Sequence, residues 1–479
     1  MSSTPDPVQP DVDVRVDGPS FSTLPLSAST LANLETLGYR SMTPIQAASL
    51  PHSLAGKDLI ARAKTGSGKT AAFGLSLLHR LDRKRWVIQA LVLCPTRELA
   101  DQVSTEIRRL ARGEDNVKVL TLCGGSPIHP QITSLQHGAH VVVGTPGRVL
   151  DHVARGTLKL DAVRTLVLDE GDRMLDMGFF DDIASVAARC PVERQTLLFS
   201  ATYPDGIAEI ARRFQRSPVE VHLAERHAPG QIRQRFYVVD EDERAATVTK
   251  ILRHHRPVRA LAFCNTKQRC RELVEHLTAD GIVALALHGD LDQRDRDQVL
   301  VQFAHRSCTV LAATDVAARG LDIEGLECVI NVDVTRDPEV HVHRVGRTGR
   351  VDEEGWAFTL VGPRESESVR RIEEFQGQAA EWHTTTELVA HDRSPLVPPM
   401  VTLQILAGRK DKIRAGDVLG ALTGDAGLPA AQVGKITVFD MATYVALDRR
   451  VGAKALQRLS TGTIKGRAVR VRLLRPSDS

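Results

Sequence analysis

Three carboxylate side chains lie within four consecutive positions, directly after a short apolar run. In the stretch LVLDEGDRM, Asp169, Glu170 and Asp172 come directly after three apolar residues. Such a run is typical of a buried strand, so these side chains are expected where a strand ends. Carboxylate oxygens are ligands that Mg²⁺ prefers, and an ionised carboxylate can accept a proton from water. An acidic loop without chemistry is the alternative, and the choice depends on whether the chain also supplies a phosphate.

A phosphate-binding loop is predicted from the stretch AKTGSGKT. Gly66 and Gly68 would let backbone N–H groups approach phosphates at the start of a helix. Lys69 would reach the outer phosphates, and the Thr70 hydroxyl would ligate Mg²⁺. The residues expected to bind the nucleotide here are Ala63, Lys64, Thr65, Gly66, Ser67, Gly68, Lys69 and Thr70.

This loop gives each carboxylate an expected role. Asp169 would hold Mg²⁺ together with Thr70, and Glu170 would orient and deprotonate the attacking water. Ser200 and Thr202 end the next apolar run, where their hydroxyls could hydrogen-bond Asp172. Asp172 is therefore expected to couple the site to its surroundings and not to bind the metal.

An arginine-rich motif, HRVGRTGR, lies far along the chain. Arg347 and Arg350 could neutralise charge on a γ-phosphate if a second domain brings them to it. A solvated arginine-rich surface is the ordinary alternative for such a loop. The glycine spacing and the predicted phosphate loop favour the catalytic interpretation.

The motifs lie within two successive blocks in which apolar runs alternate with helical patterns. ALVLCPT, HVVVGTP, TLVLDE and TLLFSAT belong to the first block, and RALAFCNT, VALALHGD and CTVLAATD to the second. Near-continuous runs of this kind are typical of parallel strands covered on both faces by helices. The last segment has the order strand, helix, two strands, helix, strand, which RNA-recognition modules use. We therefore expect an α/β protein with two tandem doubly wound domains and a small C-terminal α+β domain.

Domain boundaries follow from proline-rich stretches and from the ends of these blocks. The expected parts are a disordered tail at 1–20, an ATP-binding domain at 21–222, a linker at 223–232, a second α/β domain at 233–375, a second linker at 376–400 and an RNA-binding domain at 401–475.

Charge is distributed unevenly along the 479 residues. Residues 401–479 contain 14 Lys and Arg against 6 Asp and Glu, whereas the rest contains 48 against 53. Residues 401–479 thus have a net charge of +8, and the rest of the chain has a net charge of −5. A separate basic segment of this kind predicts an anion-binding module, with nucleic acid as the anion. No apolar run is long enough to cross a membrane, and seven cysteines lie without metal-binding spacing. The composition predicts a cytoplasmic protein with reduced thiols.

Taken in order, these motifs resemble those of the DEAD-box ATP-dependent RNA helicases, and the C-terminal segment resembles the RNA-binding domain of the DbpA type. The resemblance implies two RecA-like domains, a domain like an RNA recognition motif, and ATP with Mg²⁺ as cofactors. In the stretch GYRSMTPIQ it implies that Gln46 reads adenine while Tyr39 packs on the ring. Asp322 would contact the ribose, and His343 would join the coupling residues. Closure of the two domains on RNA would unpair a short duplex, and hydrolysis would release it.

RNA contacts are also implied by the resemblance. In the helicase domains the expected contacts are Arg97, Gly125, Thr145, Arg148, Arg296 and Thr314. In the C-terminal domain they are Arg409, Lys410, Lys412, Arg414, Lys435, Lys465 and Arg467, with the binding face left open because no aromatic pair is obvious beyond Phe439 and Tyr444. The implied partner is a hairpin of 23S ribosomal RNA during large-subunit assembly. A monomer is expected, with neither DNA nor a membrane as partner.

One residue departs from the family pattern. Gly171 replaces the usual alanine, giving DEGD. A methyl group neither binds metal nor transfers a proton, so we expect catalysis to survive. Two rivals remain: a translocating helicase that acts on DNA, and an RNA chaperone with other specificity or with turnover impaired through Gly171.

Overall fold

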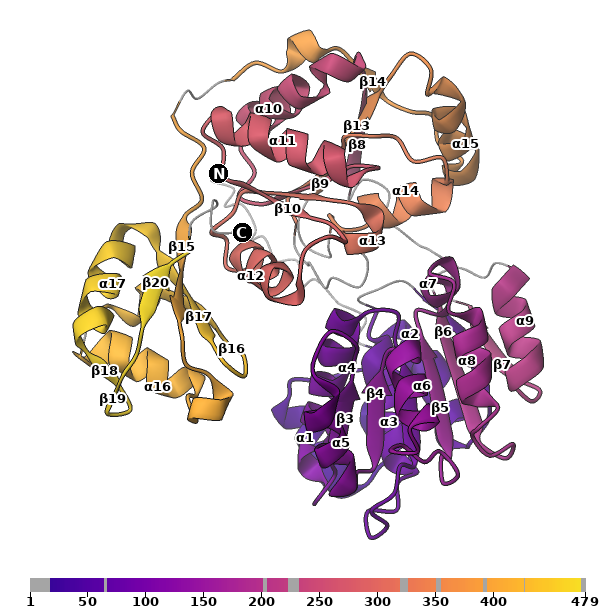
Figure 1. Cartoon of the computed structure of the whole chain (residues 1–479). Helices are drawn as coiled ribbons and strands as arrows, with labels where there is room; N and C mark the ends of the chain where they lie inside the picture. The colour runs from indigo at the N-terminus through magenta and orange to yellow at the C-terminus, as the bar shows by residue number, and fades with distance from the viewer. Residues whose placement is uncertain are drawn as a thin grey trace, which may run out of the picture. The chain divides into compact units, whose positions relative to one another are not determined.

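The computed structural model describes residues 18–63, 67–200, 205–222, 232–318, 326–349, 355–390, 394–425 and 427–474. Six expected site residues lie outside these ranges, namely Lys64, Thr65, Gly66, Thr202, Asp322 and Arg350. The chain divides into two compact units, residues 1–225 with 320–322, and residues 226–319 with 323–479. Each unit is described by itself (Figure 1).

The first unit contains a seven-stranded parallel sheet with the order β3-β4-β2-β5-β6-β1-β7. The strands are β1 (Leu59–Arg62), β2 (Ala90–Leu93), β3 (Val119–Leu122), β4 (Val141–Gly144), β5 (Thr165–Asp169), β6 (Gln195–Ser200) and β7 (Val219–His222). The helices are α1 (Ala28–Thr36), α2 (Pro44–Leu54), α3 (Lys69–His79), α4 (Arg97–Leu110), α5 (Ile128–Gln136), α6 (Pro146–Ala154), α7 (Gly171–Asp176), α8 (Phe180–Ala187) and α9 (Asp205–Phe214).

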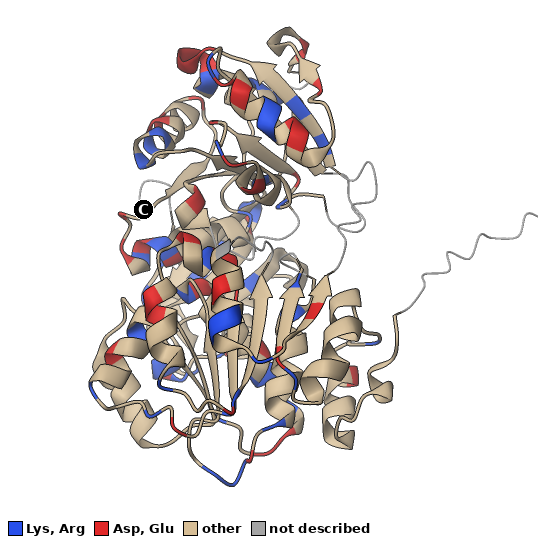
Figure 2. Cartoon of the chain, turned by 90° about the vertical axis from the view of Figure 1, so that its right-hand side faces the viewer, with Lys and Arg blue, Asp and Glu red and all other residues tan. Residues whose placement is uncertain are grey.

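Helices cover both faces of this sheet, so the central strands are buried. Alternate residues of β2 enter two separate apolar cores, with Val92 in one and Leu91 in the other. In Figure 2 the strands of this sheet are tan for nearly their whole length, and the charged residues lie on helices and loops. Continuous apolar strands therefore form here because neither face of the sheet meets water.

The second unit begins with another seven-stranded parallel sheet, of order β10-β11-β9-β12-β13-β8-β14. The strands are β8 (Ile232–Val238), β9 (Ala260–Phe263), β10 (Ala284–Leu287), β11 (Val310–Ala313), β12 (Cys328–Asn331), β13 (Gly355–Val361) and β14 (Trp382–His383). The helices are α10 (Arg244–His255), α11 (Lys267–Ala279), α12 (Gln293–Ala304), α13 (Asp315–Ala318), α14 (Pro338–Val345) and α15 (Ser366–Gln376). The expected linker at 376–400 needs a correction, because β14 pairs with β8 and extends this sheet.

The C-terminal part of the second unit is a four-stranded antiparallel sheet of order β16-β17-β15-β20. Its elements are β15 (Met400–Ile405), α16 (Ala415–Gly420), β16 (Val433–Val438), β17 (Thr443–Asp448), α17 (Gly452–Thr461), the hairpin β18 (Thr463–Ile464) and β19 (Arg467–Ala468), and β20 (Val471–Leu473). Leu403 and Val445 on one face pack with residues of α16 and α17. The expected α/β class, with two tandem parallel-sheet domains and a small α+β domain, is confirmed.

The other face of the small sheet is buried as well. Thr402 and Tyr444 lie on this face and are 1% and 4% exposed. Tyr444 clusters with Val301 of α12. The Oγ1 atom of Thr402 lies 2.7 Å from Oγ of Ser307, and Thr437 Oγ1 lies 3.1 Å from Nε2 of His305. The face that could have presented Tyr444 to RNA therefore packs against the helicase domain of the same unit.

Within the part of the chain that the structure describes, no helix has both the length and the apolar composition needed to span a membrane.

Candidate active site and RNA-binding surfaces

The phosphate loop ends in a left-handed glycine that begins α3. Gly68 has φ 92° and is the N-cap of the helix, and Lys69 is its first residue. The Lys69 side chain is buried, and its Nζ atom has no hydrogen-bond partner among the described residues. A buried ammonium group is costly unless an anion accompanies it, and a helix N-terminus also favours anions. This arrangement fits a phosphate group.

Sheet topology brings the carboxylates to the same edge as this loop. β6 pairs with both β5 and β1, so the ends of β5 and β1 lie two strands apart at one end of the sheet. The backbone N–H of Ala63 donates to the carbonyl of Ser200 at 3.0 Å. The crevice beyond the carboxyl ends of parallel strands is where such folds bind ligands.

Asp169 ends β5 in a buried position. Burial raises the pKa of its carboxyl group to about 7, and the positive charge of Lys69 opposes this shift while Glu170 adds to it. A cation would relieve the cost of the ionised form. No group of three or more His, Cys, Asp or Glu side chains in the described ranges could hold a metal ion. Mg²⁺ usually takes only one or two protein carboxylates besides substrate phosphates, so Asp169 and the Thr70 hydroxyl fit it.

Glu170 adopts a left-handed backbone conformation, with φ 52° and ψ 54°, and is the N-cap of α7. Its Oε2 atom accepts a hydrogen bond from Nη1 of Arg173 at 2.6 Å. Asp172 follows in the first turn, where its backbone N–H donates to Oγ of Ser200 at 3.1 Å. The expected contact between Asp172 and Ser200 thus forms, but through the backbone of Asp172, whose carboxylate accepts from the N–H of Arg173.

Of the two residues expected at the adenine, Gln46 lies directly beside the end of the phosphate loop. Gln46 is buried, its Oε1 accepts from the N–H of Thr43 at 2.9 Å, and its Nε2 donates to the carbonyl of Gly68 at 3.1 Å. Tyr39 donates its hydroxyl to Oε1 of Glu106 at 2.6 Å. Burial, followed by this hydrogen bond, raises the pKa of Tyr39 well above its ordinary value. Glu106 was not expected from the sequence because nothing near it in the chain marks it.

Arg347 and His343 lie at the end of α14 in the second unit, where the backbone N–H of Arg347 donates to the carbonyl of Arg344 at 3.2 Å. Sequence reasoning missed Arg344 itself. Its guanidinium group is buried and donates to both carboxylate oxygens of Asp315 at 2.7 Å and to Oδ1 of Asn265 at 3.1 Å. This network joins the ends of β9 and β11 to α14. The polar residues that follow those strands, Asn265 and Asp315, are the feature of the sequence from which it could have been predicted.

The expected RNA contacts of the first unit gather at the loops after β2, β3 and β4. Gly125 has φ 73°, and a Cβ atom there would overlap the guanidinium group of Arg97. Only glycine therefore lets Arg97 lie against this loop. Arg148 donates to the carbonyl of Ser126 at 3.1 Å, and Thr145 is the N-cap of α6. The four predicted contacts Arg97, Gly125, Thr145 and Arg148 thus share one edge of the sheet.

In the second unit the expected contacts lie beside β10 and β11. Thr314 follows β11, and its N–H donates to the carbonyl of Leu287 in β10. Arg296 of α12 donates to the carbonyl of Ala317 at 2.8 Å. The two residues are positioned by neighbouring elements, as expected for a common surface.

A basic hollow of about 560 Å³ opens in the C-terminal domain. Its lining residues are Arg409, Lys412, Ile413, Arg414, Ala415, Val438 and Lys465. Lys412 and Lys465 have φ 62° and 54°, and the Lys465 ammonium donates to the carbonyl of Lys412 at 3.2 Å. Left-handed non-glycine residues cost energy and gather at functional sites. Of the other expected contacts, Lys410, Lys435 and Arg467 do not line this hollow.

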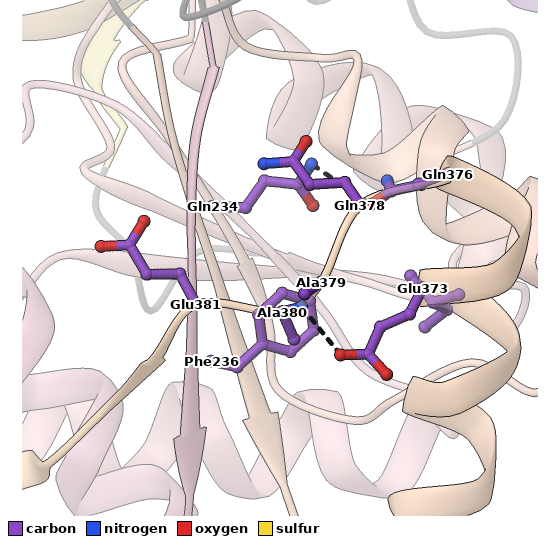
Figure 3. A pocket seen from close by; sticks show the side chains of 9 residues that line it. Gln234, Phe236, Glu373, Gln376, Gln378, Ala379, Ala380 and Glu381 are labelled. Carbon is purple, nitrogen blue, oxygen red and sulfur yellow. Dashed lines mark hydrogen bonds between the residues drawn. The ribbon is translucent and has the colours of Figure 1, made fainter.

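A second hollow lies between β8 and the loop after α15 (Figure 3). Gln234, Glu373 and Gln376 point toward it, and Ala380 donates its N–H to Glu373 at 2.8 Å. With room of about 20 Å³ it could hold a single water molecule but no nucleotide.

Three family models match the chain. DEAD/DEAH box helicase matches residues 43–210, helicase conserved C-terminal domain matches 243–352, and DbpA RNA binding domain matches 402–473. The ATP-dependent RNA helicase DbpA of Escherichia coli (strain K12) is 51% identical over 457 residues, which cover 95% of this chain and 100% of that protein. The ATP-dependent RNA helicase CshA of Listeria monocytogenes is 48% identical over 74% of this chain and 68% of that protein.

Solved structures agree with these matches. S. cerevisiae Dbp5 bound to RNA and ADP BeF3 has a TM-score of 0.70 and 30% sequence identity, covering 77% of this chain and 96% of that chain.

Proposed function

The chain belongs to the DEAD/DEAH box helicases and is an ATP-dependent RNA helicase of the DbpA type, and from this premise we propose which residues carry each step and which RNA it serves. The family, the use of ATP and an RNA partner were expected from the motifs and are confirmed. The roles of individual residues, Mg²⁺, the RNA target and a monomeric state are proposed below.

Lys69 and the phosphate loop would bind the outer phosphates of ATP. The main observation that supports this assignment is the buried ammonium group of Lys69 at the start of α3, which has no hydrogen-bond partner in the described part of the chain. Mg²⁺ bound at Thr70 and Asp169 would neutralise charge between the phosphates. Glu170 would accept a proton from the attacking water.

Coupling to RNA would run through the contact of Asp172 with Ser200, joined by Thr202 and His343. Arg347 and Arg350 of the second unit would stabilise charge on the γ-phosphate during transfer. Gln46 would exchange its hydrogen bonds to Gly68 of the phosphate loop and to Thr43 for bonds to adenine, and Asp322 would contact the ribose. Binding of adenine would thereby change the contact between α2 and the loop.

RNA would bind to the helicase domains through its backbone. Arg97, Arg148 and Arg296 supply guanidinium groups, and Gly125, Thr145 and Thr314 bring backbone or hydroxyl groups to the same surfaces. Contacts to phosphates and sugars position the RNA but carry no sequence information. The core is therefore expected to unwind short duplexes locally and without sequence preference.

Target choice would come from the C-terminal domain. Its outer sheet face is covered by α12, so the basic hollow around Lys412 and Lys465 is the surface we assign to RNA. We propose a hairpin of 23S ribosomal RNA as the target and large-subunit assembly as the process. Support comes from the DbpA RNA binding domain and from the net charge of +8 on residues 401–479.

The test compares stimulation of ATP hydrolysis by a 23S fragment that contains the hairpin with stimulation by an unrelated hairpin of equal length. Truncation at residue 400 would expose Val301 of α12, so the full chain with Lys412→Gln and Lys465→Gln is the better variant. We expect the preference for the fragment to fall roughly tenfold to thirtyfold, since each lost phosphate contact costs on the order of 1 kcal/mol. Stimulation by the unrelated hairpin should persist.

Lys454→Gln with Arg458→Gln is the matched control, because both residues are exposed on α17 and outside the hollow. This control should keep the preference. Equal stimulation by both RNAs in the unaltered chain would refute the proposed target.

A further inference from the structure

An ion pair holds the carboxylate that we assign to water activation. Nη1 of Arg173 lies 2.6 Å from Oε2 of Glu170, three residues apart at the start of α7. The two side chains are only 11% and 8% exposed. A charge-assisted hydrogen bond of this length, shielded from water, restricts a side chain strongly.

Glu170 needs such a restraint because its backbone offers little. The residue is an N-cap in the left-handed region, where its side chain makes no capping hydrogen bond to α7. A glutamate side chain has three rotatable bonds, and several rotamers would point the carboxylate away from any water beside a phosphate. Efficient proton transfer requires the base within hydrogen-bond reach of that water.

Arg173 also balances charge at a site with a surplus of carboxylates. Asp169, Glu170 and Asp172 are all buried, and Lys69 is a buried cation near Asp169. Removing one partner of a buried ion pair leaves the other charge uncompensated. Without Arg173 the Glu170 carboxylate would lose this restraint on its orientation.

We propose that Arg173 is a positioning residue that holds Glu170 in the orientation needed to accept a proton from the attacking water. This inference rests on the proposed function, in which Glu170 is the base. A purely structural role, in which the pair only stabilises the short helix α7, is the alternative. The second alternative is a latch, in which the ion pair keeps the Glu170 carboxylate away from the attacking water in the resting state.

The experiment measures RNA-stimulated ATP hydrolysis by the full chain with Arg173→Gln and with Arg173→Lys. Arg173→Gln should lower kcat about tenfold, less than the roughly 10²–10⁴-fold contribution of a general base, because Glu170 is misplaced and not removed. It should leave KM for ATP within about twofold. Arg173→Lys retains a cation and should recover most of the rate. Affinity for a fluorescent ATP analogue is measured on the same variants and should stay close to that of the unaltered chain. The thermal unfolding midpoint is measured as well and should fall in Arg173→Gln, because a buried ion pair loses one partner.

Arg155→Gln is the matched control, since Arg155 forms an exposed ion pair with Asp151 at 2.6 Å on α6. It removes one arginine charge from the same unit and should leave kcat unchanged. A double-mutant cycle with Glu170→Gln, followed in single turnovers, completes the test. Arg173→Gln should slow the chain that carries Glu170 and should add nothing once Glu170 is replaced.

The outcomes separate the alternatives. A rise in kcat with Arg173→Gln would establish the latch and overturn the proposal. A fall in kcat with an equal effect in the Glu170→Gln background and no recovery by lysine would establish the structural role and overturn the proposal as well. If Glu170→Gln is inactive while Arg173→Gln has full activity, the inference fails and the proposed function stands. If Glu170→Gln retains full activity, the assignment of the base fails first and the inference falls with it.

Discussion

Gly171 is the residue expected to depart from the family pattern, and its surroundings support the prediction that catalysis survives the change. It does not have a positive φ, so glycine is not required by the backbone. A Cβ atom would lie 2.7 Å from Cδ1 of Leu198 and 3.0 Å from Cδ1 of Ile207. Those two methyl groups occupy the space of the missing one, so no cavity is left beside the carboxylates.

Gly171→Ala is expected to change little. A helical alanine gains up to about 1 kcal/mol over glycine, while moving two side-chain ends costs a similar amount, on the order of 1 kcal/mol. The unfolding free energy should therefore stay within about 1 kcal/mol of the unaltered chain, and kcat within about twofold, because no catalytic atom moves. Denaturant unfolding and RNA-stimulated hydrolysis measure both.

Gly416→Ala is the control, because a Cβ atom at this helical position in α16 meets nothing within 4 Å. Gly416→Ala should raise the unfolding free energy of the C-terminal domain by the full difference in helix propensity between alanine and glycine, up to about 1 kcal/mol. Recovery of an otherwise absent hydrolysis by Gly171→Ala would contradict our account and favour an impaired helicase.

Glu106 illustrates a second effect at the scale of one residue. It accepts the Tyr39 hydroxyl and also pairs with Arg109 at 2.6 Å, so it fixes the ring that we expect to pack on adenine. Glu106→Gln should raise KM for ATP about threefold to tenfold by weakening a charge-assisted hydrogen bond, with kcat unchanged. Steady-state kinetics with ATP and GTP measure this. An unchanged KM for ATP would show that Tyr39 needs no anchor.

At the scale of elements, apolar runs ending in polar residues allowed most of the fold to be predicted. The parallel strands β2, β4, β5 and β6 form where such runs occur, because burial on both faces leaves a continuous apolar signal. β14 has only two residues and no periodicity, so its pairing with β8 could not be seen. Short motifs likewise marked the candidate site residues, whereas Arg344 and Glu106 make their contacts between distant segments.

The hollow of the C-terminal domain was also beyond sequence reasoning. Its lysines were candidates because of their charge, but the hollow lies where Lys412 and Lys465 adopt left-handed conformations in two separate turns. Lys435 carries the same charge and lies on β16 instead, where it contributes to the lowered pKa of His305. Charge alone could not separate these positions.

His305 makes the contact between α12 and the small sheet sensitive to acid. Burial, with a further contribution from the positive charge of Lys435, lowers its pKa to about 3 from an ordinary value near 6.5. Between these values the unfolded chain binds the proton and the folded chain does not, so stability falls as pH drops from about 6.5 toward 3. At pH 5 the loss should reach about 2 kcal/mol relative to pH 7.5.

Unfolding of the unaltered chain and of His305→Gln at the two pH values measures this effect. The variant can keep a hydrogen bond to Thr437 and should lose about 2 kcal/mol less than the unaltered chain. An equal loss in both proteins would place the acid sensitivity elsewhere.

At the scale of the whole molecule, the second unit joins a helicase domain to an RNA-binding domain through contacts that include a buried apolar cluster. Val301 of α12 is 6% exposed and clusters with Tyr444 and Leu474 of the C-terminal domain. Buried apolar contacts of this kind make neighbouring domains unfold together. A charge placed there should separate the two unfolding events.

Val301→Asp is therefore expected to turn one calorimetric transition of the second unit into two. Burial of an unpaired carboxylate in this cluster should cost about 2–4 kcal/mol at the contact, enough to release the C-terminal domain while leaving its own core of Leu403 and Val445 intact. Val192→Asp, at an exposed position of the first unit, controls for the added charge and should leave the calorimetric profile unchanged. A single transition in Val301→Asp would mean that the two domains remain joined without this cluster. Preserved binding of the 23S fragment by Val301→Asp would show in addition that the basic hollow binds RNA without help from α12.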